Sequence, residues 1–517
     1  MTPRPFHASR AALSALLAGA TLACASVKAV PSPGPATQPP YAAYVLLVEA
    51  PDHTPTPFAR VIVASGQPCP TLSGGPTPLA MTRRDNPHGF TVDVCEAVVP
   101  FEQPLAVSGS SLTLPAAHRK VSRVAILGDT GCKPGNQGDC GLDDPQWPFP
   151  ALAKAAAANA PELVLHMGDY NYRGTPSHFK QTVNGTTTKV YYYDAGDGAP
   201  AEQSCGLKAP YYSQNTAAGI EGFNPDSWES WWLDFFQPAA PLLSAAPWVV
   251  ARGNHELCSH AGPGWLYFLG PSSNLPAGGG AQVSCPPQQN TGPVESHLVF
   301  VPPQVLSLDG LTVVVVDSAN ACDELNNFAD RYAQQLASIS TRLGRNDTGA
   351  VWLMGHRPPW GLEGTSSAPP FSCDNQPGTS SAQPYAVFNR TLQCAFASAS
   401  GSALLPKLTL SLAGHMHRFE SLTFAAGSSR PQQLIVGNSG VLEGTKPPTG
   451  SFSQIIDGQQ ASGFSIAQFG FVQLDRGAGG TWSGAVVTPA PTAWSAVLPA
   501  CGSSPTPGAF LCVKALP

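Results

Sequence analysis

The chain has 517 residues, of which 12% are charged, and a formal net charge of −6. Its length exceeds that of an average domain and predicts two to four domains. The sequence has no long block of lysine and arginine, so the electrostatic signature of a nucleic-acid-binding protein is missing. Hydrophobic residues make up 43% of the chain, which predicts a loop-rich globular protein rather than a disordered one.

The first part of the chain, 1–25, has the pattern of a secretory signal peptide. Two arginines precede an apolar segment of small residues, 11–23, which is too short to cross a bilayer stably. Two processing routes remain open: cleavage before Ser26, or cleavage before Cys24 with a lipid anchor on that cysteine. Thr21 stands where a lipoprotein signal usually has leucine, which favours the first route. We expect an exported protein, secreted or periplasmic, with no transmembrane helix.

Cysteine usage fits export. The sequence has 13 cysteines, and removing Cys24 with the signal leaves 12, an even number that favours six disulfides. An oxidising compartment argues against a thiolate nucleophile and against cysteine-bound zinc. Sequence alone does not fix the connectivity, but the plausible local pairs are Cys69–Cys95, Cys132–Cys140, Cys258–Cys285 and Cys501–Cys512.

Composition divides the remaining chain into four parts. Residues 26–40 are rich in proline and alanine and are predicted to form a linker. Short β-type runs between proline and glycine turns predict a small β-rich N-terminal domain over 41–119. Strand and helix patterns alternate through 120–490, the predicted catalytic domain, and 491–517 forms a disulfide-containing tail.

In chain order, the catalytic region begins with apolar strands at 121–127 and 163–167. An alanine-rich helix at 149–160 joins them into a βαβ unit with parallel strands. A helix at 225–237 carries five aromatic residues at helical spacing, and we interpret them as core rather than as a substrate-stacking surface. The next predicted elements are strands at 247–251, 311–316, 351–354 and 408–412, with a helix between 323 and 344. Runs of β type after residue 419 predict a second sheet packed on the first.

Five of these strands end in a glycine followed by residues that bind metals. Carboxyl ends of strands are where open α/β sheets build their sites, so these side chains are expected to meet. The residues, in chain order, are Asp129 after Gly128; Asp169 and Tyr172 after Gly168; Asn254 and His255 after Gly253; His356 after Gly355; and His415 and His417 after Gly414.

The donor types indicate the chemistry. Two carboxylates, an amide oxygen, three imidazoles and a phenol are too many for one tetrahedral zinc but suit two hard or borderline cations. In an extended segment His415 and His417 point to the same side, so each cation can receive one imidazole. Two cations about 3.5–4 Å apart clamp a phosphoryl oxygen and activate a bound water. The pattern therefore predicts phosphoester hydrolysis.

The five motifs resemble those of the calcineurin-like metallophosphoesterase superfamily over residues 121–419. They are most like the purple acid phosphatases, because Gly131 replaces a histidine found in most other members and Tyr172 stands where these enzymes place their iron-binding tyrosinate. Leu353 departs from the usual valine of the fourth motif. The resemblance implies an α/β (α+β) fold, a four-layer α/β/β/α sandwich, with the small β-rich N-terminal domain added.

The resemblance also implies roles for the motif residues. Asp129, Asp169, Tyr172 and His417 would bind Fe(III), and Asp169, Asn254, His356 and His415 would bind a divalent ion (Zn, Fe or Mn). Asp169 would bridge the two ions, a metal-bound hydroxide would attack phosphorus, and His255 would protonate the leaving oxygen.

The predicted function is an exported binuclear phosphatase that hydrolyses phosphomonoesters, a small-molecule substrate class. A phosphodiesterase or nucleotide pyrophosphatase on the same site is one alternative, and an inactive extracellular binding protein is another, against which the intact ligand set argues. Asp317, Asn320 and Arg357 also lie near strand ends. We interpret them as structural residues, with phosphate contact as the alternative.

Overall fold

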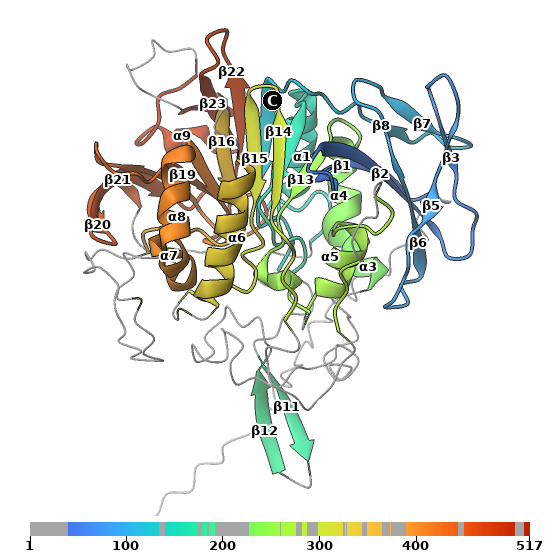
Figure 1. Cartoon of the computed structure of the whole chain (residues 1–517), viewed down its shortest axis with the longest axis horizontal. Helices are drawn as coiled ribbons and strands as arrows, with labels where there is room; N and C mark the ends of the chain where they lie inside the picture. The colour runs from blue at the N-terminus through green and yellow to red at the C-terminus, as the bar shows by residue number, and fades with distance from the viewer. Residues whose placement is uncertain are drawn as a thin grey trace, which may run out of the picture. The chain divides into compact units, whose positions relative to one another are not determined.

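The computed structural model describes most of the chain after residue 39 (Figure 1). The predicted signal peptide, 1–25, and all of the predicted linker except its last residue lie outside the described part. No helix in that part is long and apolar enough to cross a bilayer. The described residues are 40–133, 140–172, 178–183, 186–191, 227–258, 260–275, 282–286, 298–323, 326, 328–343, 349–363, 373, 389–442, 449–501 and 511–517.

Two large sheets form the centre of the fold. In spatial order, the ten-stranded sheet consists of β24 (Leu511–Ala515), β23 (Trp482–Thr488), β22 (Phe471–Arg476), β9 (Arg123–Leu127), β10 (Leu163–His166), β13 (Trp248–Val250), β1 (Ala42–Glu49), β2 (Pro55–Ala64), β6 (Val92–Val98) and β5 (Thr82–Arg83). The eight-stranded sheet consists of β14 (Gln304–Leu308), β15 (Leu311–Val315), β16 (Ala350–Met354), β17 (Leu410–Ala413), β19 (Gln432–Val436), β18 (Phe419–Phe424), β21 (Gln459–Ile466) and β20 (Gly450–Ile456).

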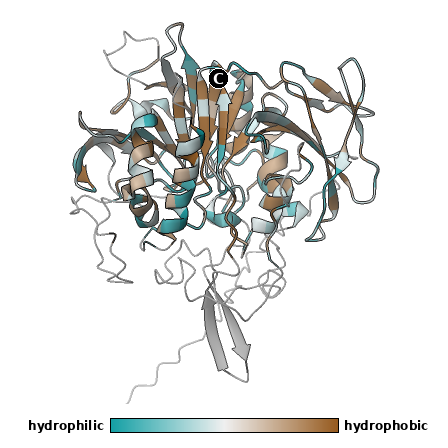
Figure 2. Cartoon of the chain, in the orientation of Figure 1, coloured by the Kyte–Doolittle hydropathy of each residue, from teal (hydrophilic) through white to brown (hydrophobic). Residues whose placement is uncertain are grey.

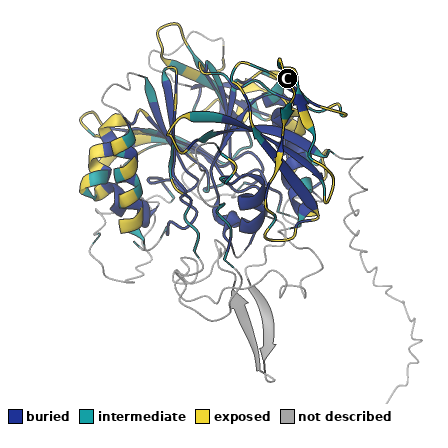
Figure 3. Cartoon of the chain, turned by 45° about the vertical axis from the view of Figure 1, so that its right-hand side comes forward, coloured by how far each residue is buried: buried dark blue, intermediate teal, exposed yellow. Residues whose placement is uncertain are grey.

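The two sheets pack face to face. On β9, Ile126 joins a buried cluster with Val313 and Leu412 of the eight-stranded sheet, whereas its neighbours Ala125 and Leu127 pack on the opposite face. Successive strand residues point to opposite faces, so β9 is buried on both sides. The central strands of the two sheets are accordingly mostly hydrophobic in Figure 2 and mostly buried in Figure 3.

Helices cover the outer face of each sheet, which confirms the predicted four-layer α/β/β/α sandwich. The ten-stranded sheet is covered by α1 (Phe149–Ala158), α3 (Trp228–Trp231), α4 (Gln237–Leu243) and α5 (Gly262–Phe268). The eight-stranded sheet is covered by α6 (Ala329–Arg342), α7 (Arg390–Ala397) and α8 (Ala399–Leu404), and a short α9 (Pro491–Trp494) precedes the last described strand.

The division into sheets differs from the prediction. We expected the second sheet to begin after residue 419, but β18 and β19 continue the sheet of β15 to β17, while β22 and β23 return to β9. The second sheet instead comprises β14 to β21, and the last strands of the chain belong to the first sheet. Strands pair through hydrogen bonds between backbone groups, which are the same in every residue except proline. The sequence of a strand that is buried on both faces therefore does not indicate which strand lies beside it.

The N-terminal strands extend the catalytic sheet. β1 pairs in parallel with β13 and antiparallel with β2, and a small sheet of β4 (Leu79–Ala80), β3 (Thr71–Ser73), β7 (Leu105–Val107) and β8 (Thr113–Leu114) packs against them. The strand from the predicted tail, β24, pairs with β23. The boundaries of the predicted domains, 41–119, 120–490 and 491–517, stay predictions. A separate hairpin is formed by β11 (His178–Val183) and β12 (Thr186–Tyr191).

Buried charges join the N-terminal strands to α5. Arg60 and Arg84 both contact Glu96 Oε2 at 3.2 Å, and all three side chains are almost completely buried. Arg60 donates to the carbonyl of Phe268, and Arg84 donates to that of Leu266. These carbonyls belong to the last turn of α5, where cations are favoured. The N-terminal strands thereby hold the helix that follows the third motif.

The predicted aromatic helix is core, as interpreted from the sequence. It begins at Trp228, passes through a π-helical turn at Trp232–Phe236 and continues as α4 to Leu243, so it extends beyond the predicted end at residue 237. Four of its five aromatic side chains are buried and the fifth is partly buried: Trp228, Trp231, Phe235 and Phe236, then Trp232.

All four predicted local disulfides are present: Cys69–Cys95, Cys132–Cys140, Cys258–Cys285 and Cys501–Cys512. The structure adds Cys373–Cys394, and Cys322 is also disulfide-bonded. The short loops made the four pairs recognisable, because cysteines close in sequence meet with little loss of chain entropy.

Candidate metal centre

The structure brings all eight predicted site residues to one place, at the carboxyl ends of strands from both sheets. β9, β10 and β13 run parallel, and so do β15, β16 and β17. Two overlapping groups could each hold an ion: Asp129, Asp169 and His417, and Asp169, His356 and His415, with ligand atoms within 4.8 Å of one another. Asp169 belongs to both groups.

Four candidate ligands have a left-handed backbone. The φ angles are 54° at Asp129, 58° at Asp169, 72° at His415 and 49° at His417. A non-glycine residue in this region costs about 1–2 kcal/mol, and such outliers cluster where function requires them. The sharp turns after the strands therefore store strain at the residues that the sequence selected as ligands. The expected extended conformation of His415 and His417 is wrong, but the two histidines still belong to different ligand groups.

Glycines in the motifs let the backbone approach the two carboxylates. A Cβ atom at Gly253 would lie 2.0 Å from Asp169 Oδ1, and one at Gly414 would lie 2.4 Å from Asp129 Oδ2. Each of these oxygens accepts a backbone hydrogen bond, from His255 N at 3.0 Å and from His415 N at 2.9 Å. The other oxygen of each carboxylate faces the centre.

The first position is formed by Asp129, Asp169, Tyr172 and His417. The Tyr172 hydroxyl lies 3.0 Å from Asp129 Oδ1, 2.9 Å from Asp169 Oδ2 and 2.9 Å from His417 Nε2. Burial and the charges of the two carboxylates raise the pKa of Tyr172 well above its usual value. A cation among these atoms would act in the opposite direction, since it stabilises a phenolate.

The second position is formed by Asp169, Asn254, His356 and His415. His356 Nδ1 lies 2.8 Å from the carbonyl of Met167, to which it donates, so its Nε2 faces the other ligands. That Nε2 lies 2.8 Å from Asn254 Oδ1, 3.3 Å from Asp169 Oδ2 and 3.2 Å from His415 Nδ1. These converging atoms can all supply lone pairs, so the position suits a cation.

The pKa of His356 reflects the same preference for positive charge. Burial alone lowers this pKa, but the charges of Asp169 and Asp129 raise it to about 9. Burial raises the pKa of Asp169, but the positive charge on His356 and the hydrogen bond from the His255 backbone N–H hold this pKa well below its usual value. The donor set therefore attracts a proton or a metal ion to the second position, and the residues fit the metal centre that the sequence predicted.

Glu256, to which the sequence assigned no role, organises the turns that carry the ligands. It is fully buried, and its Oε2 accepts from the backbone N–H groups of Asp169 and Gly253, both at 3.0 Å. Its Oε1 accepts from Tyr170 N at 2.8 Å and from Asn171 N at 3.3 Å. Burial, reinforced by the charge of Asp169, raises the pKa of Glu256 to about 8. Its only sequence signal is its place after Asn254 and His255.

His255 lies against the first position. Its ring centroid is 4.3 Å from that of Tyr172, and its carbonyl oxygen accepts a hydrogen bond from His260 Nδ1 at 2.6 Å. Burial lowers the pKa of His255 well below its usual value, so the imidazole is neutral. Lys133 lies close by, with its amino group 5.3 Å from the centroid of the Tyr172 ring, and adds a positive charge beside the site.

The structural interpretation of Asp317 and Asn320 is supported. Asp317 accepts two hydrogen bonds from the buried Arg252, at 3.1 and 2.7 Å, and one from Val301 N at 2.8 Å. Asn320 Nδ2 donates to the carbonyl of Val299 at 2.6 Å. These bonds join the third motif and β15 to the loop before β14.

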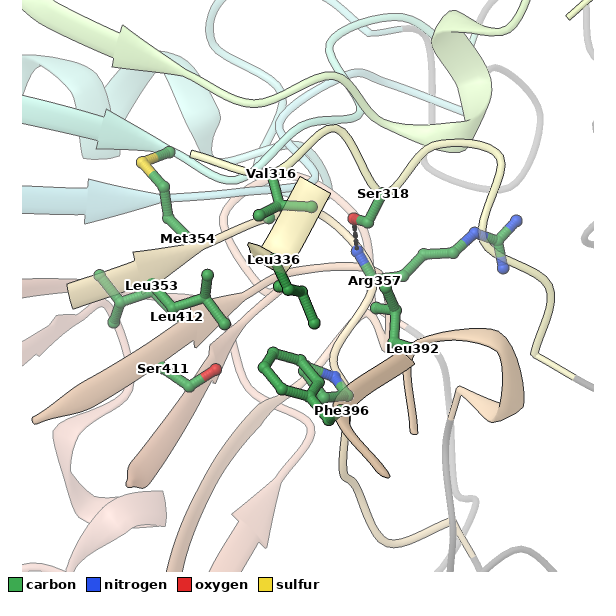
Figure 4. Close-up of a pocket in the computed structure, with 12 residues that line it drawn as sticks. Val316, Ser318, Leu336, Leu353, Met354, Arg357, Leu392, Phe396, Ser411 and Leu412 are labelled. Atoms are coloured by element: carbon green, nitrogen blue, oxygen red, sulfur yellow. Dashed lines mark hydrogen bonds between the residues drawn. The ribbon is translucent and has the colours of Figure 1, made fainter. Parts of the chain in front are cut away.

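Arg357 reaches the second position. Its Nη1 lies 3.1 Å from His415 Nε2 and contacts Asp323, a residue that the sequence did not select. Arg357 also lines a cavity of about 20 Å³. Its guanidinium group points away from the other residues that line this cavity (Figure 4). That cavity is lined mainly by apolar side chains such as Leu336 and Phe396, so it is a packing space and no substrate site.

Residues 122–419 match the family model described as calcineurin-like phosphoesterase, and this segment is more than half of the 517-residue chain. The chain belongs to the calcineurin-like phosphoesterase family. It is thus a phosphoric ester hydrolase, as the motifs predicted. No curated protein sequence matches this phosphoesterase.

Two solved structures resemble this phosphoesterase. A purple acid phosphatase from yellow lupin (Lupinus luteus) seeds is 14% identical, with 84% of this chain and 70% of that chain covered and a TM-score of 0.42. PhoD is 13% identical, with 85% of this chain and 84% of that chain covered and a TM-score of 0.43.

Proposed function

We propose that this phosphoesterase is an exported phosphatase that holds two metal ions and hydrolyses phosphomonoesters. The observation that carries the proposal is the position of Asp169, whose carboxylate belongs to two overlapping ligand groups. One shared carboxylate between two ion positions is the arrangement that a two-metal phosphoester hydrolase needs.

The charges of the donors distinguish the two positions. The first position offers the carboxylates of Asp129 and the shared Asp169, the phenol of Tyr172 and the imidazole of His417. Two carboxylates and a phenol suit Fe(III). The second shares Asp169 but otherwise offers neutral donors, an amide and two imidazoles, which suit a divalent Zn, Fe or Mn ion. When bound, the ions would polarise the phosphoryl group and lower the pKa of a coordinated water.

His255 is the proposed general acid. Its backbone N–H fixes Asp169, and its imidazole lies on the Tyr172 side of the centre. The neutral imidazole would gain a proton when a phosphate dianion binds, because the added negative charge raises the pKa of a nearby histidine. His255 would then hold the proton that the leaving oxygen requires, and Lys133 would help to attract the anionic substrate.

Disulfide bonds support the proposed export. Five pairs are formed among the described residues, and such bonds persist in oxidising compartments. The two processing routes proposed for the signal, with and without a lipid anchor at Cys24, concern residues outside the described part.

A substrate panel with elemental analysis tests the proposed reaction. The protein purified from an exporting host is expected to contain two metal ions per chain. It is expected to hydrolyse a phosphomonoester such as p-nitrophenyl phosphate faster than the matched diester. Faster cleavage of the diester or of a pyrophosphate would favour that alternative, and two bound ions without any hydrolysis would favour the binding protein.

Tyr172→Phe tests the iron assignment. The iron-loaded wild type is expected to absorb visible light through a tyrosinate-to-iron transition, and the variant is expected to lose this band while keeping its fold. Removing one oxygen leaves the buried ring in place, which is the physical reason for an intact fold. Absorption and circular dichroism spectra measure both effects. A variant that keeps the visible band would show that Tyr172 does not bind the iron.

A further inference from the structure

The two ring nitrogens of His415 face different partners. Nδ1 lies 3.2 Å from His356 Nε2 and so faces the second position. Nε2 lies on the other side of the ring, 2.9 Å from Asp323 Oδ2 and 3.1 Å from Arg357 Nη1. Because Arg357 Nη1 also donates to Asp323 Oδ2, this carboxylate oxygen is the acceptor that the two groups share. An ionised carboxylate can only accept hydrogen bonds, so the proton of the neutral imidazole resides on Nε2. Nδ1 then keeps its lone pair for a ligand in the second position.

The same arrangement occurs at the neighbouring histidine. His356 donates from Nδ1 to the carbonyl of Met167 at 2.8 Å, and its Nε2 faces the second position. Both histidines therefore have one nitrogen facing the centre and the other held by an oxygen acceptor. A partner of this kind fixes the tautomer and the ring orientation of a metal-binding histidine.

Asp323 is itself held in place. Its Oδ1 accepts from Asn389 Nδ2 at 2.7 Å, and its Oδ2 contacts Arg357. Asn389 is fully buried and also caps α7, because its side chain accepts from Leu392 N at 2.8 Å. Asn389 begins an Asn-x-Thr triplet, and in the folded chain these internal bonds occupy its amide group.

We propose that Asp323 is a positioning residue that holds His415 with Nδ1 directed at the second metal position, and that Asn389 orients Asp323 for this task. The inference rests on the proposed two-metal function. The competing interpretation is that Asp323 only neutralises Arg357, in which case the second position would not depend on it. Partners of metal-binding histidines typically change metal affinity by about 10- to 100-fold, so the two interpretations differ measurably.

The test is equilibrium dialysis of metal-depleted protein against a series of free Zn²⁺ concentrations, with bound zinc measured by elemental analysis. Wild type is expected to bind two ions per chain. In Asp323→Asn, a variant of nearly the same shape, one binding step should move to about 10- to 100-fold higher zinc while the other stays in place. This readout needs no catalytic activity.

Two further variants sharpen the comparison. Asn389→Ser keeps a residue that caps helices but is too short to reach Asp323, so it should weaken the same step by a smaller factor. Asp457→Asn is the matched control, because Asp457 pairs with Arg430 at 2.6 Å and its side chain is 19% exposed, close to the 26% of Asp323. Asp457 follows β20 and belongs to neither candidate ligand group, so its zinc isotherm should equal that of wild type.

The outcomes separate this inference from the proposed function. If wild type binds two ions and Asp323→Asn gives the same isotherm, the positioning role is wrong while the two-metal function stands. If both steps move equally in Asp323→Asn, the role at the second position is also contradicted. If wild type that has first been loaded with Fe(III) binds fewer than two metal ions in total, iron plus zinc, the proposed function fails, and this inference fails with it.

Discussion

Replacing Asp169 with asparagine is expected to lower phosphatase activity at least about 1,000-fold and to remove metal from both positions. Asp169 is the one residue that both ligand groups share. Its Oδ2 faces Tyr172 on one side and His356 on the other. Losing its negative charge therefore weakens both positions together. The measurements are kcat/KM for a phosphomonoester and the metal content per chain.

Asparagine makes this a clean test, because it has nearly the shape of aspartate. It tolerates the left-handed backbone found at residue 169, and its Oδ1 can still accept from His255 N. The fold should survive, which thermal unfolding in the presence of a chelator would show. Asp457→Asn serves again as the control and should keep wild-type activity. An Asp169→Asn protein with two bound ions and full activity would contradict the bridging role.

Glu256→Ala is expected to lower the free energy of unfolding by at least about 4 kcal/mol. Four backbone N–H groups donate to Glu256, from Asp169, Tyr170, Asn171 and Gly253. Alanine leaves all four without their acceptor in a buried place, and each unsatisfied donor costs about 1–3 kcal/mol. Chemical denaturation of metal-depleted protein measures the change without a contribution from bound ions.

Glu420→Ala is the matched control for Glu256. Glu420 is also fully buried, but among the described residues it accepts from one backbone donor, Leu362 N at 2.8 Å, and its side chain also interacts with Ser465 and Arg418. Both substitutions remove the same atoms, so their difference reports the extra hydrogen bonds at Glu256. We expect the loss at Glu420 to be less than half of that at Glu256. Equal losses would show that Glu256 does not hold the two turns in the way described.

The sequence by itself determined the local parts of the site. Each motif consists of a strand, a glycine and a ligand within a few residues. Such a motif can be identified from the sequence because strand propensity and glycine conformation are local properties. The four short disulfide loops were readable for the same reason. The donor types of Asp129, Asp169 and the histidines then indicated a centre for two cations, and the structure places these side chains together.

Only the tertiary structure decided which strands share a sheet and how the ligands are held. β1 lies beside β13 in the catalytic sheet, although the two strands are about two hundred residues apart in the sequence. No hydrophobic periodicity in the sequence predicts this pairing. Glu256 accepts a hydrogen bond from the N–H group of Asp169, which is 87 residues away in the sequence, and Asp323 is 92 residues away from His415. A carboxylate that supports a distant turn has the same sequence signature as any other buried carboxylate. Its role becomes visible only when the folded chain brings its partners within hydrogen-bonding distance.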